Sequence, residues 1–456
     1  MTFSLETLKN IFPDAQFVGL NDVEEFNLLN IAHLKQFESL SPKHVLYFVV
    51  YEDNPDQLGW YDRAFDRSLN LPKLINNKQV VAVVNNRVPN NQVVGLRYIR
   101  VKNIYQAIDT LRQYVLAQIH PLVIGVTGSV GKTTAIALIQ NVVGKQFNCG
   151  RIYSKRLTPL TLSSWLVNFL ESSHQILALE YLMYRKYHID MLIDLLRPNI
   201  GVFLNVKRMH LGVEGINTLE DIIEGKRALV EKSQVAILNL DDPFVSRLQR
   251  TGDIGFSLVD PMADVYISTD NKDVILLLNY AGQVIRFVPY VKTTLFYQQA
   301  CTAALAGSYL GMSAESIQRG LEEFSPAEQR INWINIHGEK ILFDGDVTYG
   351  ARMMALAEHH YQSSILLIHS LDFGGQIVDN QIDDVTTVFA HFSKVRILET
   401  EENRALILRY GWKNLRLVSK KDLLTDLSEF EFKIFHFGIY FRKHKDLNYL
   451  MNFLNT

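Results

Sequence analysis

Residues 122–134, LVIGVTGSVGKTT, join an apolar stretch, a glycine-rich turn and the start of a helical pattern. Glycines let backbone N–H groups close around phosphate oxygens without Cβ clashes, and a helix N-terminus adds partial positive charge. Lys132 would reach the β- and γ-phosphates of a nucleoside triphosphate, and the Thr133 hydroxyl would ligate Mg²⁺. A strand that enters a helix through such a loop is typical of parallel sheets with crossover helices. The segment therefore predicts an α/β fold that binds a nucleotide.

The glycine spacing departs from the standard Walker A motif, in which four residues separate the first Gly from Gly-Lys. Val126 stands at that first position, and Gly125 comes one residue too early. The pattern G-x-T-G-S-x-G-K-T-T is satisfied instead. It resembles the nucleotide loop of the Mur ligase family, the ATP-dependent amide-bond formers of peptidoglycan and folate metabolism. The resemblance assigns ATP to the loop residues Gly128, Ser129, Gly131, Lys132, Thr133 and Thr134.

Composition narrows the class of protein. A chain of 456 residues predicts two or three domains, and 48% hydrophobic residues supply ample core. A net charge of −2 gives no electrostatic reason to expect nucleic acid or an anionic membrane as partner. The two cysteines, Cys149 and Cys301, lie far apart, which fits a reducing compartment and disfavours a zinc site. With no signal peptide and no apolar run long enough for a bilayer, we expect a cytoplasmic monomer without membrane insertion.

The hydrophobic pattern divides the chain into three α/β segments. Residues 1–118 alternate short strands with helical stretches, and His120-Pro121 separates them from the strand before the loop. Residues 119–328 repeat strands and helices as in a parallel sheet, with an antiparallel ribbon expected around 260–292. Residues 329–456 hold the last αβ units. By resemblance these segments are an N-terminal substrate-binding domain, a central P-loop ATP-binding domain and a C-terminal Rossmann-like domain.

Two residues of the central segment match the family's metal-binding motifs. Glu180 ends the apolar run ILALE, and the end of a strand after a nucleotide loop is where open α/β sheets bind ligands. The resemblance makes Glu180 a Mg²⁺ ligand; the alternative is a strand-end carboxylate that faces solvent. His210, in IGVFLNVKRMHLG, would by resemblance ligate or orient a metal, although Mg²⁺ prefers oxygen donors.

Lys226, in EDIIEGKRALVE, stands where the family has a lysine that CO₂ carbamoylates. The resemblance makes this carbamate a ligand of a second Mg²⁺. The chemistry needs a neutral amine, which burial favours. The i±3 and i±4 neighbours of Lys226 in a helix are all apolar: Ile222, Ile223, Leu229 and Val230. They favour a partly buried lysine over one whose head reaches solvent.

Four further positions are assigned by resemblance. Arg330, before KILFDGD, would contact the γ-phosphate, as the fixed fork of arginine donors suits. Asp344 would bind the ribose hydroxyls, with Asp346 as the alternative. Gln299 takes the place of the adenine-facing Asn, and Asp372 is the candidate acid in the loop after ILLIHSL.

The resemblance implies an ATP-dependent ligase that joins a small-molecule carboxylate to an amine through an acyl phosphate. The expected catalytic residues are Lys132, His210, Lys226 and Arg330, and the expected metal ligands are Thr133, Glu180, His210 and Lys226. The N-terminal pattern looks most like the branch that joins D-alanyl-D-alanine to UDP-N-acetylmuramoyl tripeptide.

Two alternatives stay open because substrate-facing segments depart from the family. IAHLKQ (31–36) stands where a uridine-binding segment is expected, YSKRLTPLTL (153–162) replaces an Asn-rich stretch, and HFGIYFRK (436–443) replaces Lys-Gly-Ser-Arg. One alternative is a ligase of the same fold redirected to a non-UDP acceptor. The other is a non-catalytic nucleotide-binding partner of a true ligase.

Overall fold

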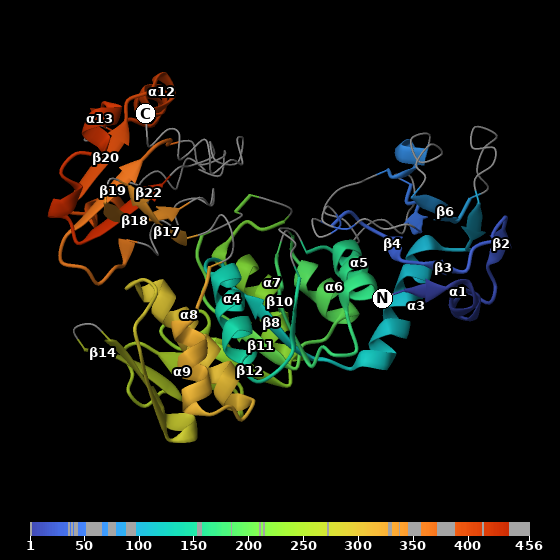
Figure 1. The fold of residues 1–456 in the computed structure, drawn as a ribbon. Helices are drawn as coiled ribbons and strands as arrows, with labels where there is room; N and C mark the ends of the chain where they lie inside the picture. The colour runs from blue at the N-terminus through green and yellow to red at the C-terminus, as the bar shows by residue number, and fades with distance from the viewer. Residues whose placement is uncertain are drawn as a thin grey trace. The chain divides into compact units, whose positions relative to one another are not determined.

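The computed structural model describes most of the chain in two compact units. The described residues are 2–34, 37, 40, 44–51, 66–71, 79–87, 97–152, 157–183, 185–208, 211–212, 215–270, 273–326, 331–336, 338–344, 357–371, 388–412 and 415–436. The first unit comprises Met1–Thr127, Gln146–Val202 and Gly212–Ala236. The second comprises Gly128–Lys145, Phe203–Leu211 and Ile237–Thr456. Figure 1 shows the elements of both units in chain order by colour.

A five-stranded sheet forms the N-terminal part of the first unit. Its order is β2-β7-β6-β5-β4, with parallel pairing from β4 to β7 and β2 antiparallel at the edge. The strands are β2 (Gln16–Val18), β4 (Leu28–Asn30), β5 (Val45–Phe48), β6 (Val80–Asn85) and β7 (Tyr98–Arg100). A short pair, β1 (Phe3–Ser4) and β3 (Glu25–Phe26), and helix α1 (Leu5–Ile11) accompany the sheet. The amphipathic segment forms helix α3 (Ile104–Ile119), which Asn103 caps.

The rest of the first unit contains the strand that leads into the glycine-rich loop. Strand β8 (Leu122–Thr127) lies parallel to β10 (Ile176–Glu180), which lies parallel to β9 (Cys149–Arg151). Glu180 is opposite Val126 in the register, so the carboxyl ends of β8 and β10 reach the same edge. The helices are α5 (Pro159–Phe169), α6 (His188–Leu195) and α7 (Leu219–Lys232); strand β11 (Ile200–Phe203) follows α6.

The second unit begins with the loop and helix α4 (Lys132–Val143), which packs against α8 (Thr294–Tyr309) and α9 (Ala314–Glu322) (Figure 1). The packing is close, since a Cβ on Gly320 would lie 2.5 Å from the Val142 Cα. Strands β12, β13 and β14 pair in parallel, and β14, β15 and β16 pair antiparallel. Their bounds are β12 (Val235–Asn239), β13 (Ile254–Ser257), β14 (Val265–Asp270), β15 (Asp273–Leu278) and β16 (Gln283–Phe287). The antiparallel ribbon expected around 260–292 is confirmed.

A six-stranded sheet follows in the same unit, in the order β17-β18-β22-β19-β20-β21. Only β17 and β18 pair antiparallel; the other neighbours are parallel. Its elements are β17 (Ile331–Ile336), β18 (Glu339–Asp344), β19 (Ser364–Ile368), β20 (Lys394–Leu398), α12 (Glu401–Tyr410), β21 (Leu417–Val418), α13 (Lys420–Leu423) and β22 (Phe432–His436). Ile341, Phe343, Ile365, Leu367 and Phe435 form its core.

The architecture confirms the predicted α/β class with parallel strands around the nucleotide loop. The three domain boundaries (1–118, 119–328 and 329–456) stay a prediction. No helix in the described part of the chain is long and apolar enough to span a bilayer.

Candidate functional site

The glycine-rich loop has a backbone that only glycine supports at two positions. Gly128 has a φ of 152° and Gly131 a φ of 89°, both in the range that L side chains rarely adopt. A Cβ on Gly131 would also lie 2.5 Å from the Gln299 Nε2. Helix α4 begins at Lys132, directly after Gly131, so its N-terminal amides and dipole end at the loop.

Gly125, the glycine that comes one residue too early, is not part of the loop. It lies in β8, and a Cβ there would be 2.7 Å from the ring of Tyr181 and 3.1 Å from Leu229 Cδ1. Tyr181 is completely buried and directly follows Glu180. The glycine at position 125 therefore has a packing reason, because the Tyr181 ring occupies the space that a side chain would need.

The side chain of Asn205, which belongs to the second unit as the loop does, holds the loop in place. Its Oδ1 accepts hydrogen bonds from the backbone N–H of Ser129 (3.1 Å) and Val130 (2.9 Å), and its Nδ2 donates to the Val130 carbonyl (3.0 Å). The Lys207 N–H donates to the Ser129 hydroxyl at 2.9 Å. Asn205 is 3% exposed. These contacts pre-form the loop, because a buried amide with satisfied partners permits few alternative conformations.

The Lys132 side chain folds over the loop. Its ammonium donates to the carbonyls of Gly128 (2.9 Å) and Ser129 (3.3 Å). Thr133 and Thr134 occupy the first turn of α4 and are partly buried. The loop thus combines a fixed cation with the positive end of a helix, which is the arrangement that binds phosphate groups.

Gln299, expected to face adenine, lies behind the loop. It is 2% exposed, and its Nε2 donates to the Gly131 carbonyl at 3.0 Å. Its neighbour Gln298 lines a cavity beside the loop. Helix α8 therefore supplies one glutamine that supports the loop and one that is available to a ligand.

This cavity has a volume of about 600 Å³ and lies entirely within the second unit. Such a volume suits a small-molecule ligand. Val130 and Asn205 connect the cavity to the loop. The cavity is also lined by Asn239, Asp241, Asp242, Thr294, Tyr297, Gln298, Glu358 and His360.

Two acids after β12 support this cavity, and the sequence reasoning missed them. Asp242 accepts hydrogen bonds from the Val206 N–H (2.9 Å) and the Phe244 N–H (3.0 Å). Asp241 accepts from the Ser257 hydroxyl and the Leu258 N–H. Their position in the sequence could have indicated them, because both acids directly follow the apolar run VAILNL, which was predicted to be a strand. Asn205 likewise follows shortly after a strand, since β11 ends at Phe203.

Two aromatic side chains stack at one wall of the cavity. The rings of Tyr297 and His360 lie 5.1 Å apart at an interplanar angle of 19°. The Thr294 Oγ1 lies 3.3 Å from the His360 Nε2. Burial lowers the pKa of His360 and raises the pKa of Tyr297 to about 12, so both rings are neutral at pH 7. A neutral π-face of this kind suits a planar heterocycle.

Glu180 and Lys226 belong to the first unit. Glu180 ends β10 and is partly buried. Lys226 is 4% exposed in α7, and its four apolar neighbours are also buried, which confirms the expected buried lysine. Asp221 and Thr218 form a capping box at the start of this helix.

The remaining predicted residues lie outside the described part of the chain. They are His210, Arg330, Asp346, Asp372 and the side chain of Asp344, whose backbone ends β18 opposite His436. Within the described ranges, no group of three or more His, Cys, Asp or Glu could hold a metal ion. The oxygens of Glu180 and Thr133 nonetheless belong to the donor class that Mg²⁺ selects.

Comparisons with known proteins identify relatives of the chain. Residues 126–271 match the Mur ligase middle domain. The chain is 24% identical over 405 residues to a UDP-N-acetylmuramoyl-tripeptide–D-alanyl-D-alanine ligase of Bacillus subtilis, across 80% of this chain and 84% of that ligase. It is 24% identical over 303 residues to a UDP-N-acetylmuramoylalanine–D-glutamate ligase of Hydrogenobaculum sp., across 62% and 68% of the two chains.

Solved structures share the fold over nearly the whole chain. MurF from Acinetobacter baumannii superposes with a TM-score of 0.75 at 16% identity, covering 100% of this chain and 99% of that one. The MurF ligase from Thermotoga maritima, in complex with ADP, superposes with a TM-score of 0.72 at 18% identity, covering 94% and 98%. The multidomain architecture expected from the sequence is therefore confirmed.

Proposed function

The chain belongs to the Mur ligase family, and on that premise we propose that it is an ATP-dependent ligase that forms an amide bond through an acyl phosphate. The observation that carries the proposal is the pre-formed loop of Gly128–Lys132, held by Asn205 and continuous with a cavity of about 600 Å³. A nucleoside triphosphate fits this combination, with phosphates at the loop and the nucleoside in the cavity.

Within the cavity, the residues divide by chemistry. The stacked rings of Tyr297 and His360 offer a π-face to the base, and the Gln298 amide offers hydrogen bonds to its edge. By family resemblance, Asp344 or Asp346 binds the ribose, and Arg330 contacts the γ-phosphate.

The proposed metal ligands are taken from the family pattern. By that resemblance, Thr133, Glu180, His210 and carbamoylated Lys226 would each be a Mg²⁺ ligand. When bound, Mg²⁺ supplies charge neutralisation at the phosphoryl oxygens. The burial of Lys226 supports this role, because a low-dielectric environment favours the neutral amine that reacts with CO₂.

The chain's own residues would position the substrates and neutralise the charge of the phosphates. Lys132 balances charge on the γ-phosphate as the substrate carboxylate attacks phosphorus in line, which yields an acyl phosphate and ADP. The substrate amine then attacks the acyl carbon, and inorganic phosphate leaves from the tetrahedral intermediate with loss of one proton from nitrogen. Most of the acceleration comes from position and electrostatics.

The relatives favour one substrate pair. The Bacillus subtilis relative is named for joining a UDP-N-acetylmuramoyl tripeptide to D-alanyl-D-alanine. We therefore propose a muramoyl-peptide carboxylate and a dipeptide amine as substrates. Neither a redirected acceptor nor a non-catalytic role is favoured by these relatives.

Changing Lys132 to alanine tests the activity. Lys132→Ala removes the one loop cation bonded to Gly128 and Ser129, and we expect substrate-dependent ADP release to fall at least about 10³-fold. The assay supplies UDP-N-acetylmuramoyl tripeptide, D-alanyl-D-alanine and Mg²⁺-ATP, with mass detection of the amide. Lys145→Ala is the control, because Lys145 lies just beyond the opposite end of α4, where it pairs with Glu323. Retained activity in Lys132→Ala would overturn the assignment.

A further inference from the structure

The segment that follows Glu180 lies along the helix that carries Lys226. We define the post-β10 segment as residues 181–183 with 185 and 186. All of it, together with β8, β10 and α7, belongs to the first unit.

The first contact of this segment is at Tyr181. Its backbone N–H donates to the Val126 carbonyl at 2.8 Å, and its carbonyl accepts from the Thr127 hydroxyl at 2.9 Å. Its ring fills the space beside Gly125, which Leu229 of α7 also contacts. Tyr181 thus fixes the backbone directly after Glu180 against both β8 and α7.

The second contact is between Met183 and Gly225. A Cβ on Gly225 would clash with the Met183 Sδ, and Met183 is only 4% exposed. Gly225 immediately precedes Lys226. A glycine inside a helix is less favourable for stability than alanine. Here it permits the segment to approach the helix backbone next to the lysine.

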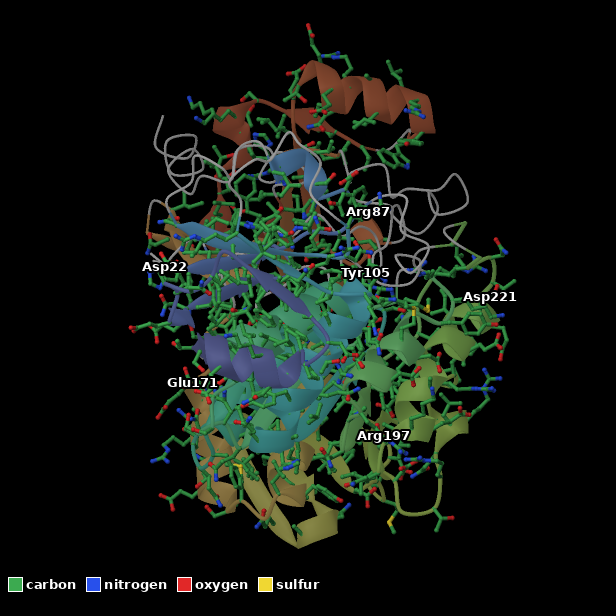
Figure 2. The ribbon with its side chains drawn as sticks, turned by 90° about the vertical axis from the view of Figure 1, so that its right-hand side faces the viewer. Asp22, Arg87, Tyr105, Glu171, Arg197 and Asp221 are labelled. Atoms are coloured by element: carbon green, nitrogen blue, oxygen red, sulfur yellow. The ribbon has the colours of Figure 1, made fainter. Side chains whose placement is uncertain are left out.

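The third contact is ionic. The Lys186 ammonium lies 2.7 Å from the Glu224 Oε2 and 3.4 Å from the Asp221 Oδ1. Asp221, labelled in Figure 2, is the residue that completes the capping box of α7. The three contacts reach α7 at Leu229, Gly225 and the Asp221/Glu224 pair, and so span the turns on both sides of Lys226.

We propose that the post-β10 segment, with Lys186 as a positioning residue, sets the position of Glu180 relative to Lys226 and thereby the affinity of the site for a divalent cation. The inference rests on the proposed function, because it takes Glu180 and Lys226 as metal-site residues. Partners that only orient a metal site typically alter metal affinity or activity 10- to 100-fold.

The direction of the effect separates position from simple charge. By Coulomb's law, removing the positive charge of Lys186 would strengthen cation binding nearby. If Lys186 acts by position, its removal weakens binding instead.

The test measures Mn²⁺ binding by electron paramagnetic resonance, in the full-length protein with a non-hydrolysable ATP analogue and no acid or amine substrate. Lys186→Met keeps the aliphatic stem and removes the charge; we expect its Mn²⁺ dissociation constant to rise about tenfold or more. Lys186→Arg keeps the charge, and its Mn²⁺ dissociation constant should lie within about threefold of the wild-type value.

Lys232→Met is the matched control. Lys232 is also an ion-paired lysine of the first unit, bonded to Asp190 and Asp194, but it lies at the far end of α7. Both methionine variants should show similar small changes in Tm, since exposed ion pairs add little stability. Only Lys186→Met should weaken Mn²⁺ binding.

A second pair of variants tests the Met183 contact. Gly225→Ala should weaken Mn²⁺ binding although alanine favours the helix, and Met183→Ala in the same chain should restore it by making room for the methyl group. Three outcomes would overturn this inference and leave the proposed function standing. They are an unchanged Mn²⁺ affinity in Lys186→Met, an equal loss of affinity in Lys232→Met, or additive effects of Gly225→Ala and Met183→Ala. Absence of Mn²⁺ binding in the wild type would contradict the proposed metal site, and the inference with it.

Discussion

At the residue scale, the amide side chain of Asn205 helps to fix the conformation of the glycine-rich loop. Asn205 satisfies two loop N–H groups and one loop carbonyl, while it is itself almost completely buried. An alanine would remove the side-chain partner of the Val130 N–H and carbonyl, at a cost of about 1–3 kcal/mol per buried group, whereas the Ser129 N–H would keep its bond to the Asn205 backbone carbonyl. The loop conformation that we propose binds phosphate would then compete with other conformations.

We therefore predict that Asn205→Ala weakens ATP binding about tenfold or more, measured by isothermal titration calorimetry. Asn205→Asp retains the acceptor for Ser129 and Val130 but adds a negative charge beside the phosphates. It should lower Tm less than Asn205→Ala and yet weaken ATP binding more. Equal ATP affinity in wild type and Asn205→Ala would contradict this role.

At the element scale, helix α7, which carries the buried Lys226, has a well-capped N-terminus. Asp221 accepts hydrogen bonds from the Asn217 N–H (3.0 Å), the Thr218 N–H (3.0 Å) and the Thr218 hydroxyl (2.9 Å). These bonds, led by that from Asn217, lower the pKa of Asp221 from 3.8 to about 2. A carboxylate at a helix N-terminus also interacts favourably with the dipole.

The sign of the pH effect follows from that lowered pKa. The folded protein binds fewer protons at Asp221 than the unfolded chain between about pH 4 and pH 2. The stability from Asp221 is therefore present above pH 4 and lost as the pH falls towards 2. In urea unfolding experiments, the difference in unfolding free energy between wild type and Asp221→Asn should shrink as the pH falls through this range. A difference in unfolding free energy between wild type and Asp221→Asn that is constant with pH would contradict this prediction. Loss of the other capping side chain, in Thr218→Ala, should lower the unfolding free energy by about 1 kcal/mol at pH 7.

At the scale of the whole molecule, a backbone bridge within the second unit joins helix α8 to the segment that leads into β19 of the C-terminal sheet. Thr293 and His359 form an antiparallel bridge, and the Thr294 N–H donates to the Glu358 carbonyl at 2.9 Å. Glu358 and His360 reach the cavity from this bridge. The segment that leads into the sheet is thus also part of the cavity wall.

Buried histidines make this unit sensitive to acid. Burial lowers the pKa of His369, at the end of β19, from 6.5 to about 4, and also lowers the pKa of His359 and His360. The unfolded chain therefore binds more protons between pH 6.5 and 4. The stability that comes from keeping these histidines neutral is fully present above pH 6.5 and is lost as the pH falls to 4. We expect the unfolding free energy of wild type to fall more steeply over this range than that of His369→Gln, measured in urea; parallel slopes would contradict this.

Much of the site followed from local sequence. The strand–loop–helix at 122–134, the carboxylate of Glu180 at a strand end and the burial of Lys226 were all correctly expected. Each depends on hydrophobic periodicity or turn residues within a few positions, where the chain's own geometry limits the outcome. The roles of these residues in catalysis stay predictions.

Contacts across the fold could not be predicted in this way. Asn205 lies 76 residues from Ser129, and Gln299 lies 168 residues from Gly131, so no local pattern relates them. Gly125 shows the difference most clearly. Its presence is plain in the sequence, but only the packed ring of Tyr181 explains why a side chain is excluded there. Local propensity decides the elements, whereas close packing between distant segments decides which side chains meet.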